Sequence, residues 1–164
     1  KEAVIIASTL DKEQTVKVPQ HPFIFRFEVH PSQAGKGQLA VIFQNAQSDS
    51  LACEWQMQID KERAQFALDT QPEFESDQQT LREGGDVSTA QNYAIENGLT
   101  FDHPFTVRML IYPSAKVNGT LMDVEIDQQR TMLSYRPHLF VDQIKFQMKD
   151  VQIKHVEYKA LKEN

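Results

Sequence analysis

The chain has 164 residues, 40% of them hydrophobic, and its 17 Lys and Arg against 23 Asp and Glu give a net charge of -6. This size and apolar content predict a single folded domain over residues 1–164 and argue against extensive disorder. The acidic balance argues against nucleic acid and anionic membrane surfaces as partners, and no apolar run reaches the roughly 20 residues of a membrane helix.

Strict alternation of apolar and polar residues begins at Phe23 and runs through residues 23–29, 39–43 and 53–59. A period of two predicts strands with one buried and one solvent-facing side. A polar link at residues 60–63 leads into a further alternating segment, 64–68, and predicts a hairpin with a four- or five-residue loop. Cys53 and Trp55 occupy apolar positions here, so we expect an inert buried thiol and a core tryptophan.

The middle of the chain, residues 71–98, is polar and acidic and shows no sustained alternation. Unstructured loops of this length are uncommon in compact domains, so we expect short strands near residues 80–82 and 93–95. Two facing carboxylates in this region would permit glycoside hydrolysis, whereas a solvated acidic loop is the ordinary interpretation. The carboxylates concerned are Asp69, which lies just before this segment, and Glu73, Glu75, Asp77, Glu83 and Asp86 within it.

Alternation returns at residues 105–111 and 122–126, on either side of the turn dipeptide Asn118-Gly119, and a polar link at 127–130 leads into 131–135. The last apolar set changes phase twice, after 144–148 and after 151–153, which predicts β-bulges in a strand that bends between two sheets. Roughly nine to eleven strands predict an all-β, antiparallel two-sheet β-sandwich of the jelly-roll or concanavalin-like kind.

The alternation also predicts which side chains are buried. The expected core includes Phe25, Phe27, Val41, Trp55, Met57, Phe66, Val107, Met109, Val124, Ile126 and Leu133. Some apolar residues lie at the alternate positions, on the side of the strand that faces away from this core. We expect them either to form one exposed interface patch or to lie beneath the chain's own loops. These residues are Ile24, Ala40, Ile42, Leu110 and Met132.

The sequence shows no recognisable catalytic arrangement, and we predict no enzymatic activity, no metal site and no cofactor. The five histidines are scattered and have neither His-x-His nor His-Glu-x-x-His spacing. A nucleophile elbow and a phosphate-binding glycine loop are also lacking. Sugar recognition would need exposed aromatic side chains, and Tyr93 and Tyr112, near loop ends, are the candidates for ligand binding.

Three segments of the second half, residues 105–112, 120–127 and 132–136, resemble the C-terminal β-sandwich module of the family 32 glycoside hydrolases, the invertase, levanase and inulinase group. Val124-Glu125-Ile126 stands where the family has Val-Glu-Val, and Ser134-Tyr135-Arg136 stands where it has Thr-Ser-Arg, with Tyr135 replacing a small residue. The hairpin over residues 55–68 resembles the strands that open that module. The resemblance covers a little more than half of the chain.

This resemblance implies a non-catalytic module that supports a carbohydrate-active enzyme or binds an oligo- or polysaccharide. Its partner would be a catalytic domain of the same parent protein, because the family's motifs Asn-Asp-Pro-Asn-Gly, Arg-Asp-Pro and Glu-Cys do not occur here. We accordingly expect a piece of a longer protein, or a mature product, that is secreted or periplasmic. Two alternatives stay open: a free-standing carbohydrate-binding module and a sandwich-fold polysaccharide hydrolase.

Overall fold

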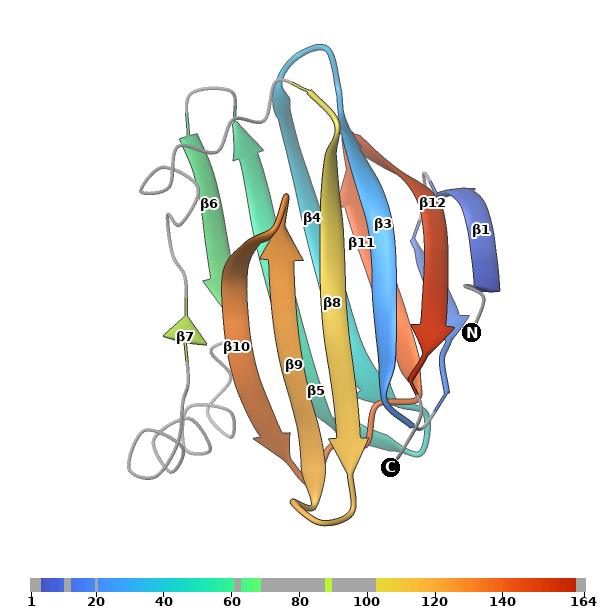
Figure 1. Ribbon diagram of the computed structural model, residues 1–164. Coiled ribbons are helices and arrows are strands. Elements are labelled where there is room, and N and C mark those ends of the chain that lie inside the picture. The colour runs from blue at the N-terminus through green and yellow to red at the C-terminus, as the bar shows by residue number, and fades with distance from the viewer. Residues whose placement is uncertain are drawn as a thin grey trace.

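A computed structural model describes residues 4–10, 13–19, 21–60, 63–68, 88–89 and 103–161, together with most of their side chains. Its strands are β1 (Val4–Leu10), β2 (Gln14–Lys17), β3 (Phe23–Pro31), β4 (Lys36–Asn45), β5 (Ser48–Asp60), β6 (Arg63–Leu68), β7 (Ser88–Thr89), β8 (Phe105–Ser114), β9 (Gly119–Ile126), β10 (Gln129–Pro137), β11 (Gln143–Lys149) and β12 (Val151–Ala160). They form two sheets packed face to face (Figure 1). The predicted all-β antiparallel sandwich is confirmed.

The two sheets differ in size and in the segments that build them. The seven-stranded sheet has the order β1-β12-β3-β8-β9-β10-β7, and the five-stranded sheet has the order β2-β11-β4-β5-β6. Each hairpin keeps its two strands side by side within the same sheet. The hairpins β4–β5 and β5–β6 belong to the five-stranded sheet, and β8–β9 and β9–β10 belong to the seven-stranded sheet. The described part of the chain contains no helix that is long and apolar enough to cross a membrane.

Alternation decides which residues lie between the sheets. Phe25 and Phe27 of β3 are fully buried, and both contact Phe146 of β11, with ring centroids 5.8 Å and 5.3 Å apart. This aromatic cluster joins one sheet to the other. Of the predicted core, the side chain of Phe66 lies outside the described residues, and nine members are buried as expected: Phe25, Phe27, Val41, Trp55, Met57, Val107, Met109, Val124 and Ile126.

The prediction that Leu133 is buried is wrong, because it is only half-buried. The register of β10 against β9 shifts between Arg130 and Met132, and Leu133 pairs with Asp123 on the outer side of the sheet. A one-residue shift exchanges the two faces of a strand. The same shift pairs Arg136 with Thr120, and both of these polar residues are fully buried.

The two predicted phase changes near the C-terminus have different structural causes. The first is a change of sheet, since β11 belongs to the five-stranded sheet and β12 to the seven-stranded sheet, with Asp150 alone between them at a φ of 60°. The second is a register shift of β12 against β3 between Lys154 and Glu157, where His155 has a φ of 55°. The predicted passage between sheets and the predicted bulge are both present.

Other elements differ from the prediction. The turn between β9 and β10 is shorter than the four-residue link and consists of Asp127 and Gln128, whose φ values of 45° and 71° are typical of a two-residue hairpin turn. β1 and β2 are not predicted by the sequence pattern. The strands expected at 80–82 and 93–95 lie outside the described residues, whereas Ser88–Thr89 forms β7 at the edge beside β10.

Candidate functional site

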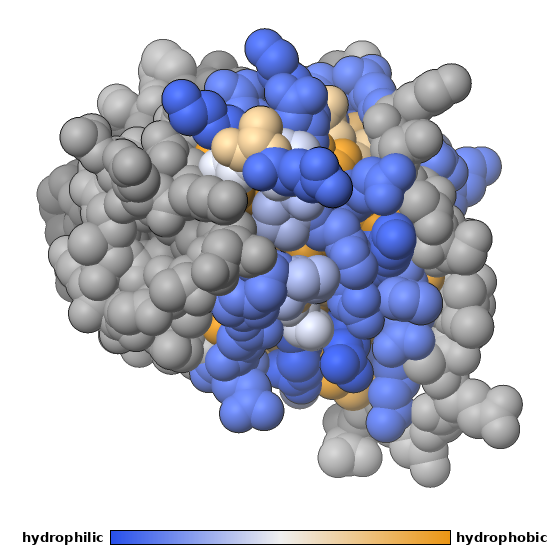
Figure 2. Space-filling model, turned by 90° about the horizontal axis from the view of Figure 1, so that it is seen from above, coloured by the Kyte–Doolittle hydropathy of each residue, from blue (hydrophilic) through white to orange (hydrophobic). Residues whose placement is uncertain are grey.

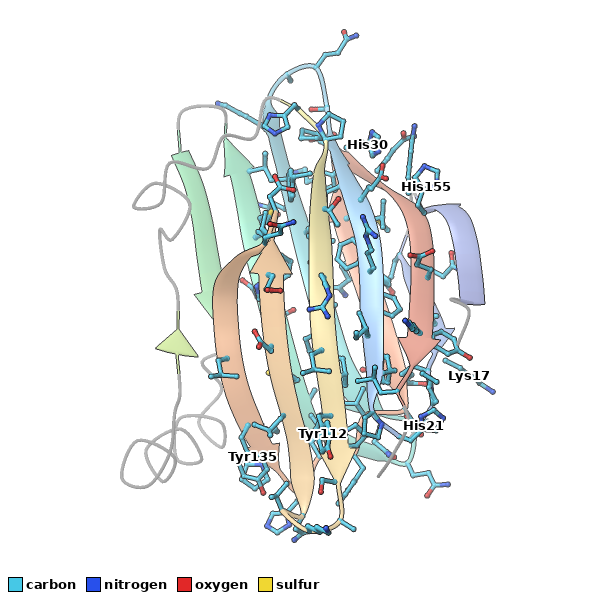
Figure 3. All side chains as sticks on the ribbon, in the orientation of Figure 1. Lys17, His21, His30, Tyr112, Tyr135 and His155 are labelled. Atoms are coloured by element: carbon cyan, nitrogen blue, oxygen red, sulfur yellow. The ribbon has the colours of Figure 1, made fainter. Side chains whose placement is uncertain are left out.

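Tyr112, one of the two predicted ligand-binding residues, lies on the outer face of the seven-stranded sheet and is 41% exposed. It pairs with Leu121, which is 38% exposed and pairs in turn with Tyr135. The Tyr135 hydroxyl donates to the carbonyl oxygen of Val117 in the β8–β9 loop. Figure 3 shows Tyr112 and Tyr135 at the same end of the sandwich. Figure 2 looks onto the opposite end, where hydrophilic residues dominate among those that are coloured.

The remaining predicted site residues contribute less. Tyr93 and the middle-segment carboxylates, Glu75 and Asp86 among them, lie outside the described residues. Trp55 and Cys53 are buried in the core, as predicted. Over the described ranges, His, Cys, Asp and Glu form no group of three or more suited to a metal ion.

The four outer apolar residues whose side chains are described do not form one patch, so the first of the two expected alternatives, a merged interface patch, is wrong. Ile24 and Leu110 pair with each other on the seven-stranded sheet, whereas Ala40 and Ile42 lie on β4 of the five-stranded sheet. The outer faces of a sandwich point away from each other, and all four side chains are half-buried. The side chain of Met132 lies outside the described residues. Two separate surfaces result, and each has its own chemistry.

On the five-stranded sheet, Ala40 and Ile42 form an apolar strip along β4, called the β4 strip below. The side chains of β4 that alternate with them, such as Val41, point into the core. In the row of Ala40, Gln147 of β11 lies on one side and Gln56 of β5 on the other. The short methyl group of Ala40 therefore lies between two long amide side chains.

The neighbouring row repeats this arrangement with charged groups. Ile42 lies between Lys145 of β11 and Glu54 of β5. Neighbouring strands are about 4.8 Å apart, and successive rows on one face are about 7 Å apart. The β4 strip is therefore an apolar surface bordered on both sides by hydrogen-bonding side chains.

The bordering side chains are held by contacts among themselves. Glu13, which precedes β2, accepts a hydrogen bond from the Gln147 amide at 3.1 Å and forms an ion pair with the Lys145 ammonium group at 3.3 Å. On the other side, the Gln56 amide donates to the Glu54 carboxylate. Both borders thus present partly pre-oriented donors and acceptors, as recognition of hydroxyl groups requires.

The outer face of the seven-stranded sheet has a hollow of about 360 Å³, called the arginine hollow below. Its floor includes a row in which Arg26 pairs with Arg108, and Arg108 pairs with Glu125. The Arg108 guanidinium lies 3.3 Å from the Glu125 carboxylate. The lining residues are Arg26, Thr106, Arg108, Glu125, Asp127 and Gln128.

Asp127 fixes the edge of the arginine hollow. Its carboxylate accepts a hydrogen bond from the Thr106 amide, and its own amide donates to the Thr106 carbonyl oxygen, both at 3.0 Å. An aspartate that bonds a nearby backbone amide is expected at a turn. Here the bonded amide belongs to β8 and closes the open end of the β8–β9 ladder.

Neither surface was identified from the sequence. In the sequence, their polar residues are simply those that alternate with apolar residues predicted to be buried, namely Glu54, Gln56, Arg26 and Arg108. The sequence contains one usable indication, because Ala40 and Ile42 are apolar at positions of the strand where the alternation predicts outward-facing polar residues. Their bordering residues on β11 are brought together with β5 only by the strand order.

Neither a family model nor a curated protein sequence matches the chain. Solved structures do match. A Caenorhabditis elegans galectin, LEC-6, aligns with a TM-score of 0.56 at 10% identity, covering 93% of this chain and 94% of the galectin. The alginate lyase Aly36B aligns with a TM-score of 0.53 at 9% identity, covering 95% of this chain and 80% of the lyase.

A fructofuranosidase from Schwanniomyces occidentalis, complexed with fructosylnystose, aligns with a TM-score of 0.51 at 9% identity. That alignment covers 99% of this chain but only 33% of the fructofuranosidase. At such identities the likeness shows the sandwich fold alone.

Proposed function

We propose that this chain is a non-catalytic carbohydrate-binding module and that the β4 strip is its sugar-contacting surface. The observation that carries the proposal is the apolar pair Ala40 and Ile42, bordered on both sides by hydrogen-bonding side chains. A sugar ring presents C–H groups on its faces and hydroxyl groups around its edge. A ring lying on the strip would therefore meet apolar atoms below and polar groups at both edges.

The charges around the strip favour an uncharged ligand. Lys145 is compensated by Glu13 on one border, whereas Glu54 on the other border accepts from the neutral Gln56 amide and keeps its negative charge, which would repel an acidic sugar. Support also comes from one of the similar structures, a fructofuranosidase complexed with fructosylnystose, whose name refers to an oligosaccharide. We therefore infer a neutral oligosaccharide as the ligand.

Binding to a glycan array, followed by calorimetric titration of the oligosaccharide that binds best, tests the proposal. The array should include fructo-oligosaccharides. Ala40→Arg should abolish binding, because its long charged side chain covers the strip. Gln56→Ala should weaken binding by about tenfold, as expected for the loss of one or two hydrogen bonds.

Gln152→Ala is the matched control, since Gln152 is an exposed glutamine on β12 of the other sheet. Its affinity for the oligosaccharide should equal that of the unmodified protein. An array without any bound glycan would overturn the proposal, as would an Ala40→Arg variant that binds with full affinity.

The module is further proposed to belong to a secreted or periplasmic carbohydrate-active enzyme, in the manner of the C-terminal module of family 32 glycoside hydrolases. The alignment with only 33% of the fructofuranosidase supports this, because a sandwich of this size is there part of a longer enzyme. Large exposed apolar side chains also gather at the β8–β9 hairpin, namely Tyr112, Val117 and Leu121, and suit contact with a neighbouring domain. A parent reading frame that encodes no catalytic domain would contradict this role.

The isolated chain should hydrolyse no fructan, sucrose or common glycan, since the sequence shows no recognisable catalytic motif. Reducing-sugar release from a polysaccharide panel measures this directly. Reproducible turnover that disappears in Glu75→Gln or Asp86→Asn would instead establish the sandwich-fold hydrolase alternative.

A further inference from the structure

The arginine hollow contains a charge arrangement that folding does not require. Arg26 of β3 and Arg108 of β8 are direct cross-strand neighbours, and both are exposed. Cβ atoms of such neighbours lie about 5 Å apart, and like charges placed opposite each other destabilise a sheet. A compensating anion bound between the two guanidinium groups would remove this repulsion.

The acidic residues nearby leave one of the two guanidinium groups available. Glu125 is engaged with Arg108 at 3.3 Å, and the Asp127 carboxylate accepts from the Thr106 amide at 3.0 Å. Glu157 of β12 is opposite Arg26 in register, yet no ion pair of Arg26 occurs among the described residues. Arg26 therefore supplies an uncompensated positive charge beside the hollow.

The rest of the lining specifies more than charge. Thr106 contributes a hydroxyl group, Gln128 an amide, and the free lone pairs of Glu125 and Asp127 can accept hydrogen bonds. A ligand that fits this set carries an oxyanion for the arginines and hydroxyl groups for the acceptors. Guanidinium groups bind carboxylates through paired hydrogen bonds, which favours a planar carboxylate.

We propose that the arginine hollow is a second binding site, which takes the carboxylate of an acidic sugar between Arg26 and Arg108. The site lies on the opposite outer face from the β4 strip and is independent of it. A chain with both sites would hold a neutral and an acidic saccharide at the same time.

Titration with sodium glucuronate at constant ionic strength, followed through the arginine side-chain NMR signals, tests the site. We expect saturable shifts of Arg26 and Arg108 with glucuronate and none with glucose. Arg26→Gln should weaken glucuronate binding at least tenfold, as for loss of a charge-assisted contact. Glu157→Gln should strengthen it, because a negative charge on the strand beside Arg26 is removed.

Lys149→Gln is the control, since it removes the same charge from an exposed position of the five-stranded sheet and should leave the affinity unchanged. The melting temperature of Arg26→Gln should equal or exceed that of the unmodified protein, as relief of repulsion predicts. Three results would overturn the proposal: no saturable shift, an equal response to inorganic sulfate and glucuronate, or a large drop in the melting temperature of Arg26→Gln.

Discussion

The two outer faces of the sandwich share one core and differ in what they offer to a ligand. On the five-stranded sheet, apolar Ala40 lies between two amide side chains and apolar Ile42 lies between Lys145 and Glu54. On the seven-stranded sheet, two arginines lie side by side over a hollow, with exposed Tyr112 two rows away on the same strand. Burial fixes the inner residues of both sheets, whereas the outer residues are free to differ in chemistry, and the two proposed binding sites make use of that difference.

The largest expected effect comes from the shared core. Phe27→Ala should lower the free energy of unfolding by about 3–5 kcal/mol, because it removes a fully buried ring that contacts Phe25 and Phe146. Chemical denaturation measures this loss. Tyr112→Ala, on the outer face of the same sheet, should cost only about 0.5 kcal/mol or less. Equal losses in the two variants would show that outer residues also determine stability, contrary to the distinction drawn between inner and outer faces.

A smaller loss of stability, confined to the seven-stranded sheet, is expected from a substitution at Gly119, where β9 begins. A Cβ atom there would lie 2.7 Å from the Tyr135 ring and would also collide with the carbonyl oxygen of Arg136. Gly119→Ala should therefore cost about 1–3 kcal/mol, a typical value for overpacking, and should displace Tyr135 from its place beside Leu121. Thermal denaturation and the NMR signals of Tyr135 measure the two consequences. Oligosaccharide affinity at the β4 strip should stay unchanged, and a loss of that affinity would mean that the two faces are coupled.

Alternation predicted the inner faces well, and its failures have identifiable causes. Burial of Phe25, Val41 and Trp55 follows from a period of two and needs no knowledge of strand pairing. Leu133 was misplaced because the bulge in β10 depends on its register with β9. β2 was not predicted because it is a strand of four residues whose partner, β11, lies far along the chain.

The outer faces were less predictable, since their chemistry depends on strand order. Tyr112 was correctly expected near a loop end, and its role in ligand binding stays a prediction. The pairing of Arg26 with Arg108 requires β3 and β8 to be neighbours, and the borders of the β4 strip require β11 and β5 to flank β4. No local pattern in the sequence specifies these contacts.

Backbone amide NMR during titration with the bound neutral oligosaccharide tests the central claim most directly. Our account predicts that the shifts concentrate on β4, β5 and β11, around Ala40, Gln56 and Gln147, while β3, β8 and β9 stay unchanged. Shifts concentrated around Tyr112 and Leu121, with no change along β4, would contradict it.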